Sequence, residues 1–395
     1  MVRTLDDLGA EGAALGVRVD INSPMSGSDL ADDARLRAHV DTLSELTDRG
    51  ARVAVLAHQG RPGEAEFQPL ETHADRLGDL LDAPVTYCDA TFSADAREAV
   101  RDLSDGEVVV LENTRFYSEE YMEWDPEEAG DTHLVRKLAP VLDAYVNDAF
   151  AAAHRSQPSL VGFPQRLPAY AGRVMETELD VLGSVDEAPE PRAFVLGGAK
   201  VSDSIDVARS VLERGVADSV LAAGIVGNAF LLADGVTLGA ASAEVVNERS
   251  SEAVQRAGDL LDDFGHRIYM PRDVAVERDD ERVELDVSEL PATEPAMDVG
   301  PRTVSAYADV LEDAGTVVLN GPAGVFEDER FAYGTEELYT AATRAEHSVV
   351  GGGDTAAALR RLGIEGFGHV STGGGATLRM LTGDPLPAVD ALDAD

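Results

Sequence analysis

The chain has 395 residues, a mass of 41.8 kDa and 44% hydrophobic residues, which is enough for two domain cores and excludes wholesale disorder. Its net charge of −42 repels nucleic-acid phosphates and anionic lipids, so we expect neither nucleic acid nor a membrane as a partner. The single cysteine, Cys88, excludes an internal disulfide and a multi-cysteine metal site.

Short apolar runs alternate along the chain with amphipathic stretches. The first series predicts strands at 16–22, 51–58, 83–88, 106–113 and 144–150, with helices between them. The second series predicts strands at 192–198, 218–224, 266–270, 273–277, 315–321, 347–353 and 368–372. Such alternation indicates parallel sheets covered by helices on both faces. We therefore expect two α/β domains joined by a helix over 169–185.

Arginine dominates the basic residues of this acidic chain. Of the 32 basic residues, 30 are arginines and two are lysines, Lys137 and Lys200. Molar salt screens the mutual repulsion of the carboxylates, so the composition favours a halophilic protein over an acidic protein of ordinary cytoplasm. No signal peptide or membrane-spanning run is apparent, and we expect a cytoplasmic location.

Basic and polar side chains follow the predicted strands of the first domain, where ligands bind in open α/β sheets. Arg35 opens the first helix, and the side chains at strand ends include Asp20, Asn22, His58, Arg61, Arg115, His154 and Arg155. Arginine forks bind phosphate and carboxylate oxygens, so these residues together predict a basic basin for a small anion. Any one arginine could equally belong to a surface salt bridge.

Glycine-rich loops occupy the equivalent positions of the second domain, at 197–202, 320–327, 351–355 and 371–377. Glycines after a strand let backbone N–H groups approach phosphates at a helix N-terminus. Asp354 could hold Mg²⁺, Glu327 could accept hydrogen bonds from a ribose, and Lys200 suits a transferring phosphoryl group. An anion basin in one domain and a nucleotide site in the other predict a two-domain kinase.

Several segments carry a resemblance to a known family. They occur along the chain in the order RVDINSP, HQGRPGE, VLENTRF, YVNDAFAAAHR, LGGAKVSD, NGPAGVFE, GGGDTAA and HVSTGGGAT. In these segments and their order the chain resembles phosphoglycerate kinase over nearly its full length. The segments DINSP and HQGRPGE are similar to the archaeal branch, and the acidic composition suggests a haloarchaeal member.

The resemblance implies two Rossmann-like parallel-sheet domains with a hinge, and phosphoryl transfer between ATP and 3-phosphoglycerate, giving ADP and 1,3-bisphosphoglycerate, in a monomer. It implies a phosphoglycerate-binding domain over 1–168, an interdomain helix over 169–187, a nucleotide-binding domain over 188–380, and a segment over 381–395 that packs back on the first domain. We expect closure about the connecting helix to be needed for turnover.

The resemblance also assigns site residues. Phosphoglycerate would be bound by Asp20, Ile21, Asn22, Arg35, His58, Gln59, Gly60, Arg61, Arg115, His154 and Arg155. The nucleotide would be bound by Lys200, Ser204, Glu327, Gly352, Gly353, Asp354 and Thr355, with Asp354 on Mg²⁺. The transferring group would be stabilised by Arg35, Lys200 and backbone amides at Gly373, Gly374 and Gly375.

Three departures from the family pattern bear on the nucleotide site and the basin. Ser204 stands where the family commonly has a second lysine, the run AAGIVGNAF (222–230) differs from the usual triple glycine near the adenine, and AFAAA precedes His154 in place of AFGTA. Two alternatives therefore stay open. One is a kinase for another small carboxylate, and the other is a non-catalytic nucleotide-binding regulator of the same fold.

Overall fold

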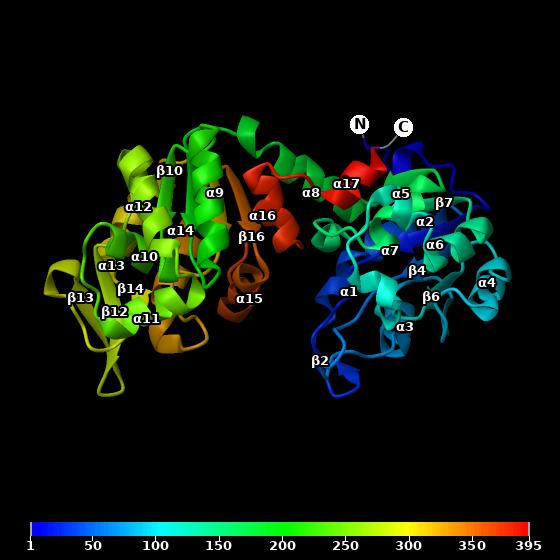
Figure 1. Ribbon diagram of the computed structural model, residues 1–395, viewed down its shortest axis with the longest axis horizontal. Helices are drawn as coiled ribbons and strands as arrows, with labels where there is room; N and C mark the ends of the chain where they lie inside the picture. The colour runs from blue at the N-terminus through cyan, green and yellow to red at the C-terminus, as the bar shows by residue number, and fades with distance from the viewer. Residues whose placement is uncertain (1, 394–395) are drawn as a thin grey trace. The chain divides into compact units, whose positions relative to one another are not determined.

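The computed structural model describes residues 2–393, which form two compact units (Figure 1). Unit 1 runs to Asp180 and takes in the segment from Pro385 onward, and unit 2 is Val181–Asp384. The chain thus enters unit 2 once, within a single helix, and returns to unit 1 near its end. Within the described residues, no helix is both long and apolar enough to cross a membrane.

Unit 1 is built on a six-stranded parallel sheet of order β5-β6-β4-β1-β7-β8. Its strands are β1 (Ala14–Arg18), β4 (Arg52–Leu56), β5 (Val85–Cys88), β6 (Val108–Leu111), β7 (Ala144–Asn147) and β8 (Ala169–Ala171). β1 is central and wholly buried, and its Gly16 pairs with Ala54 of β4 and with Tyr145 of β7. The strand order reverses between β1 and β7, which marks the ligand-binding position of an open α/β sheet.

Helices cover this sheet because their apolar residues recur at helical spacing. They are α1 (Ala34–Ala38), α2 (Val40–Asp48), α3 (Glu71–Leu80), α4 (Ala94–Arg101), α5 (Pro126–Ala129), α6 (His133–Leu138) and α7 (Pro158–Val161). Leu43 and Leu46 of α2 pack with Val53 and Val55 of β4 in the core. A short hairpin, β2 (Met25–Ser26) with β3 (Asp29–Leu30), leads into α1.

Unit 2 repeats the design with a parallel sheet of order β11-β10-β9-β15-β16-β17. Its strands are β9 (Arg192–Leu196), β10 (Ser219–Ala222), β11 (Ile268–Tyr269), β15 (Thr316–Asn320), β16 (His347–Gly351) and β17 (His369–Val370). Its helices are α9 (Val201–Glu213), α10 (Gly224–Ala233), α11 (Ala240–Arg249), α12 (Ala253–Phe264), α13 (Pro301–Glu312), α14 (Tyr333–Ala342), α15 (Gly353–Leu362) and α16 (Gly375–Thr382). Here the order reverses between β9 and β15.

The strand predicted at 273–277 belongs to a different sheet from the one expected. β12 (Asp273–Arg278) lies between β13 (Glu281–Asp286) and β14 (Ala296–Val299) in a small antiparallel sheet. The prediction of a parallel strand is wrong here, because Asp279 and Asp280 both adopt positive φ and close a two-residue hairpin. Figure 1 shows this yellow hairpin at the far end of unit 2 from α16.

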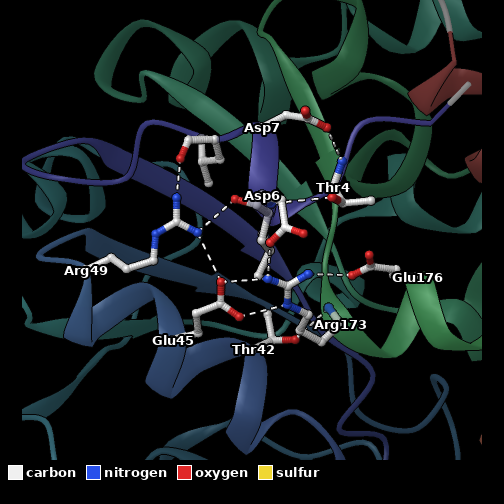
Figure 2. A network of polar contacts seen from close by, with 10 residues as sticks. Thr4, Asp6, Asp7, Thr42, Glu45, Arg49, Arg173 and Glu176 are labelled. Carbon is white, nitrogen blue, oxygen red and sulfur yellow. Dashed lines mark hydrogen bonds and ion pairs between the residues drawn. The ribbon is translucent and has the colours of Figure 1, made fainter.

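The connecting helix is shorter than predicted. Residues 169–171 form β8, which pairs with β7, and α8 (Arg173–Gly183) begins after Gly172. Figure 2 shows how its first residue is held. The Arg173 guanidinium donates to Glu45 at 2.7 Å, to Asp6 at 2.6 Å and to Glu176 at 2.7 Å. The N-terminus of α8 is therefore fixed to α2 of unit 1.

The end of the chain packs against unit 1. Helix α17 (Pro387–Leu392) contacts α7, and Figure 1 shows this red helix beside the helices of unit 1. The Ala388 N–H donates to the Ala153 carbonyl at 3.1 Å, and the side chains of Ala391 and Leu392 are buried.

Candidate active site

The basic side chains predicted to form a basin lie near one another at the carboxyl ends of β1, β4, β6 and β7. Burial, together with the nearby charges of Arg155, Arg18 and Arg61, lowers the pKa of Arg115 to about 10. Burial also lowers the pKa of Arg155, with Arg18, Arg61 and Arg35 contributing. This mutual repulsion means that the basin attracts an anion strongly.

Asp20 places a buried carboxylate within the basin. Burial by itself would raise the pKa of this carboxyl, but the charges of Arg35 and Arg18 help to outweigh burial, and the pKa is lowered to about 2. Arg35 forms an ion pair with Asp20, and its own side chain is 42% exposed. Arg35 is therefore oriented by Asp20 while its remaining donors stay accessible to a ligand.

His58 is held as a neutral ring. It is 4% exposed, and its Nδ1 lies 2.7 Å from Nη2 of Arg18. Because a guanidinium only donates hydrogen bonds, Nδ1 accepts and the proton sits on Nε2. Burial lowers the pKa of His58 well below its usual value of 6.5, and the charge of Arg18 adds to this effect.

Arg18 is itself buried, and its charge is compensated indirectly by a carboxylate that it reaches through a serine hydroxyl. Its Nε donates to the Ser159 hydroxyl at 3.0 Å, and that hydroxyl donates to the buried carboxylate of Glu120 at 2.7 Å. The Ser159 N–H donates to the same carboxylate at 2.7 Å. Arg18, Ser159 and Glu120 thus form a fixed support behind His58.

Two of the residues predicted to bind phosphoglycerate have side chains that make contacts within the protein instead. Ile21 is fully buried in the core. Gln59 is fully buried as well, and its amide accepts from the Ser23 N–H at 2.9 Å and donates to the Ser23 carbonyl at 2.8 Å. Next to it, the Gly60 N–H donates to Asn22 Oδ1 at 2.8 Å. These contacts shape the loop that carries Asp20 and Asn22.

Arg18 and His39 are the residues of this site that were not singled out from the sequence. The His39 Nε2 accepts from the Asp20 N–H at 3.0 Å, and its Nδ1 donates to Asp148 at 2.6 Å. The other oxygen of Asp148 accepts from the Val174 N–H at 2.9 Å. An arginine inside an apolar strand was a usable signal for Arg18. His39 lies between two helices, and nothing in its local sequence marks it.

Unit 2 has a glycine-lined pocket at the switch point between β9 and β15. Its lining residues are Gly197, Gly198, Ala199, Lys200, Ser204, Asn320, Gly321, Gly352, Gly353, Asp354, Thr355, Gly374 and Leu378. The predicted nucleotide residues other than Glu327 are thus brought together. Gly373 and Gly375 flank the lining residue Gly374.

Three helices begin at this glycine-lined pocket. Lys200 is the N-cap of α9, Gly352 is the N-cap of α15, and Gly374 is the N-cap of α16. Helix N-termini present free N–H groups and a partial positive charge. Together with the exposed ammonium of Lys200, they make the pocket suited to phosphates.

Gly352 is required by the local backbone. Its φ is +90°, and a Cβ at this position would lie 2.9 Å from Asn320 Oδ1. Nearby, the Thr355 hydroxyl oxygen accepts from the Gly321 N–H at 2.7 Å, which ties α15 to the end of β15. The Ser204 hydroxyl donates to the Gly197 carbonyl at 3.4 Å and is buried. Ser204 therefore serves the loop without bringing the charge of a lysine.

A second pocket of about 260 Å³, which we call the apolar pocket, shares Gly198, Ala199 and Asp354 with the first. Glu327, predicted to meet a ribose, lines it and is exposed. Its walls come largely from α10, β14 and the segment 322–327. A phosphate pocket continuous with an apolar one has the layout of a nucleotide site.

Asp354 fits a magnesium ion. Its carboxylate is exposed at the start of α15 and lines both pockets. Mg²⁺ is usually held by one or two carboxylates together with substrate phosphates and water. Within the described residues no group of three or more His, Cys, Asp or Glu could hold a metal, so the phosphates of a nucleotide would have to supply the remaining ligands.

A family model described as phosphoglycerate kinase matches residues 5–384. The chain belongs to the phosphoglycerate kinase family. It is 73% identical over 394 residues to the phosphoglycerate kinase of Natronomonas pharaonis, covering 99% of this chain and 100% of that protein. It is 64% identical over 395 residues to that of Halobacterium salinarum, covering 99% of each.

Solved structures agree with this assignment. The crystal structure of phosphoglycerate kinase from Pyrococcus horikoshii OT3 has a TM-score of 0.93 at 42% identity and covers 99% of this chain and 98% of that one. The enzyme from Coxiella burnetii has a TM-score of 0.79 at 30% identity, with the same coverage. The predicted family, its haloarchaeal branch, the parallel-sheet two-domain fold and the prediction of a kinase are confirmed.

Proposed function

We propose that this phosphoglycerate kinase family member transfers a phosphoryl group between Mg-ATP and 3-phosphoglycerate through the residues described above. The observation that carries the proposal is the convergence of three helix N-termini and Lys200 on the glycine-lined pocket. This arrangement supplies positive charge and N–H donors at the point where phosphoryl charge would develop.

The basin of unit 1 is proposed to bind phosphoglycerate. Its phosphate and carboxylate would be held by the cationic side chains of Arg35, Arg61, Arg115 and Arg155 and by the Nε2–H of His58. His154, whose Nε2 accepts from Nε of Arg155 at 3.2 Å, would lie beside them and orient Arg155. Asp20 and Asn22 shape the floor and could accept from the substrate hydroxyl. Ile21, Gln59 and Gly60 would contribute through backbone groups, since the side chains of the first two are used within the fold.

The nucleotide is proposed to lie across the two pockets of unit 2. Its phosphates would meet Gly352, Gly353 and Thr355 at the start of α15, with Ser204 beneath them and Lys200 alongside. Its ribose would meet Glu327, and its base would enter the apolar pocket. Asp354 would hold Mg²⁺, which when bound neutralises phosphate charge.

The chemistry needs little from acid or base groups. The attacking group is a substrate carboxylate, which is already ionised at neutral pH, so no side chain has to remove a proton. The tasks left to the protein are alignment and stabilisation of the charge on the transferring group. Lys200, Arg35 and the backbone amides at Gly373, Gly374 and Gly375 are proposed to perform them.

The test uses the two lysines as a matched pair. Lys200→Ala should lower kcat by ~10²–10⁴ because it removes a charge needed in the transition state, while Lys137→Ala, at an exposed position of α6, should leave kcat unchanged. ATP consumption with 3-phosphoglycerate and Mg²⁺ is measured at low and multimolar KCl, with circular dichroism to check folding.

Other outcomes would contradict the proposal. Near-wild-type kcat in Lys200→Ala would remove this lysine from the catalytic role. A panel of small carboxylic acids tests the substrate, because faster turnover of another acid would replace 3-phosphoglycerate. Nucleotide binding without turnover of any acid would favour the non-catalytic regulator.

A further inference from the structure

The apolar pocket contains a buried amide whose hydrogen-bonding groups are unused. Asn228 lies on α10, lines the pocket and is 5% exposed. Across residues 2–393, its side chain has no hydrogen-bond partner within the protein. The amide atoms of Asn228 are not among the side-chain atoms that are shut off from solvent without a partner, so they can be reached from the pocket that the residue lines. An amide with no partner in the protein and access only from a pocket can be paired by a ligand that enters it.

The other buried polar side chain in the lining is already satisfied. The Asp298 carboxylate accepts from Nη1 of Arg282 at 2.7 Å, from the Gly334 N–H at 2.9 Å and from the Val299 N–H at 2.9 Å. These contacts occupy both of its oxygens. Asp298 therefore holds β14 in place and has little capacity left for a ligand.

The remaining polar lining residues differ from Asn228 in exposure and charge. Arg249, Glu327 and Asp354 are all exposed, so water satisfies them when the pocket is empty. They also suit the charged or hydroxylated parts of a ligand. Asn228 is neutral and lies among apolar groups such as Ile225 and Val274, so its natural partner is a flat, uncharged, polar-edged ring.

The position of Asn228 is fixed by close packing at the start of α10. A Cβ on Gly227 would lie 2.9 Å from Cγ of Pro271 and 3.0 Å from the Ala222 carbonyl. That carbonyl also accepts from the Tyr307 hydroxyl at 2.7 Å. The amide is thus presented from a backbone that has little freedom to move, which reduces the entropic cost of binding a ligand.

We infer that Asn228 reads the edge of an adenine ring. Its carbonyl oxygen accepts from the 6-amino group, and its NH₂ group donates to the neighbouring ring nitrogen, the two-point pairing that an amide makes with adenine. This inference rests on the proposed function, which places the base in the apolar pocket. It makes Asn228 a specificity-determining residue for the nucleotide, separate from the phosphate-binding loops.

The experiment compares ATP with purine riboside 5′-triphosphate, which is ATP without its 6-amino group. The wild-type enzyme should prefer ATP by about tenfold in kcat/KM, since one neutral hydrogen bond and an unpaired amide differ between the two. In Asn228→Ala and Asn228→Leu this preference should fall to about twofold or less, through KM with kcat little changed. Asn247→Ala, at an exposed position of α11, should keep the wild-type preference.

Three results would overturn the inference: equal use of the two nucleotides by the wild type, an unchanged preference in both Asn228 variants, or equal losses for both nucleotides in a folded variant. The wild-type comparison stands even if a variant fails to fold. Failure of the proposed function is recognised separately, as wild-type binding without turnover. In that case the calorimetric affinities for ADP and purine riboside 5′-diphosphate still decide the role of Asn228.

Discussion

For single residues such as His58, the sequence predicted the position in the fold but not the protonation state or the hydrogen-bond partners. The sequence marked His58 as a basin residue because it follows a strand, and the structure places it there beside Arg18 and Asp20. Its protonation state could not be predicted, because that state depends on burial and on a guanidinium 40 positions earlier in the chain. The role of the Gln59 side chain could not be predicted either, because its amide hydrogen-bonds to the backbone of Ser23, a contact that no local sequence pattern reveals.

The lowered pKa of His58 predicts how binding depends on pH. Because the folded pKa lies well below 6.5, the ring stays neutral as pH falls from 8 to 6 and gains no charge toward the anion. The pH profile of kcat/KM for 3-phosphoglycerate should therefore have the same shape near pH 6.5 in the wild type and in His58→Gln. His58→Ala should raise KM by about tenfold through loss of one hydrogen bond. A wild-type inflection near pH 6.5 that is missing in His58→Gln would contradict this.

Secondary-structure elements were predictable where their signal is local. The parallel strands and most helices follow from apolar periodicity, whereas β8 is only three residues long and exists through pairing with β7. The β12–β13 hairpin was missed because its two-residue turn is Asp279-Asp280, and turns with φ > 0 usually carry asparagine or glycine. Both errors concern pairing between segments, which periodicity within one segment cannot specify.

Gly172, at the junction of β8 and α8, provides a test at the level of elements. A Cβ there would lie 2.2 Å from Oδ1 of Asp148, the atom that accepts from Val174. Gly172→Ala should displace Asp148 and through it His39 and Asp20, lowering the free energy of unfolding by about 1–3 kcal/mol and raising KM for 3-phosphoglycerate.

Denaturant unfolding and steady-state kinetics check this expectation. Gly9→Ala is the matched control, because a Cβ at Gly9 would meet no atom within 4 Å. If Gly172→Ala had the same free energy of unfolding and the same KM as this control, the contacts from α8 to Asp20 would not contribute to stability or to substrate binding.

At the scale of the whole molecule, the division into two domains and the net charge could both be read from the sequence. The two-domain α/β architecture follows from chain length and from the alternation of strands and helices, and the structure agrees. The helix by which the chain leaves unit 1 was predicted from its apolar pattern, whereas the return of the chain to unit 1 was given only by resemblance, since it depends on packing between distant segments such as α17 and α7. The net charge of −42 acts over both units and sets their response to salt.

Salt should stabilise the folded chain. At 1 M ionic strength the screening length is about 3 Å, so repulsion among the carboxylates largely vanishes, and a gain of about 3 kcal/mol would raise Tm by roughly 10 °C. Thermal melts in 0.1 M and 2 M KCl at pH 7 measure this. The rise should shrink at pH 4.5, near the sequence pI of about 4.3, where the net charge is small. An equal rise at both pH values would assign the effect to something other than charge.

The return of α17 to unit 1 has a consequence for synthesis of the chain. Unit 2 is one continuous stretch, Val181–Asp384, whereas unit 1 needs Ala388, Ala391 and Leu392 to complete its packing. On a ribosome, every residue of unit 2 is added to the chain before the last apolar residues of unit 1. The domain that is translated first is therefore the one that is finished last, and its open face must stay soluble while the rest of the protein is made.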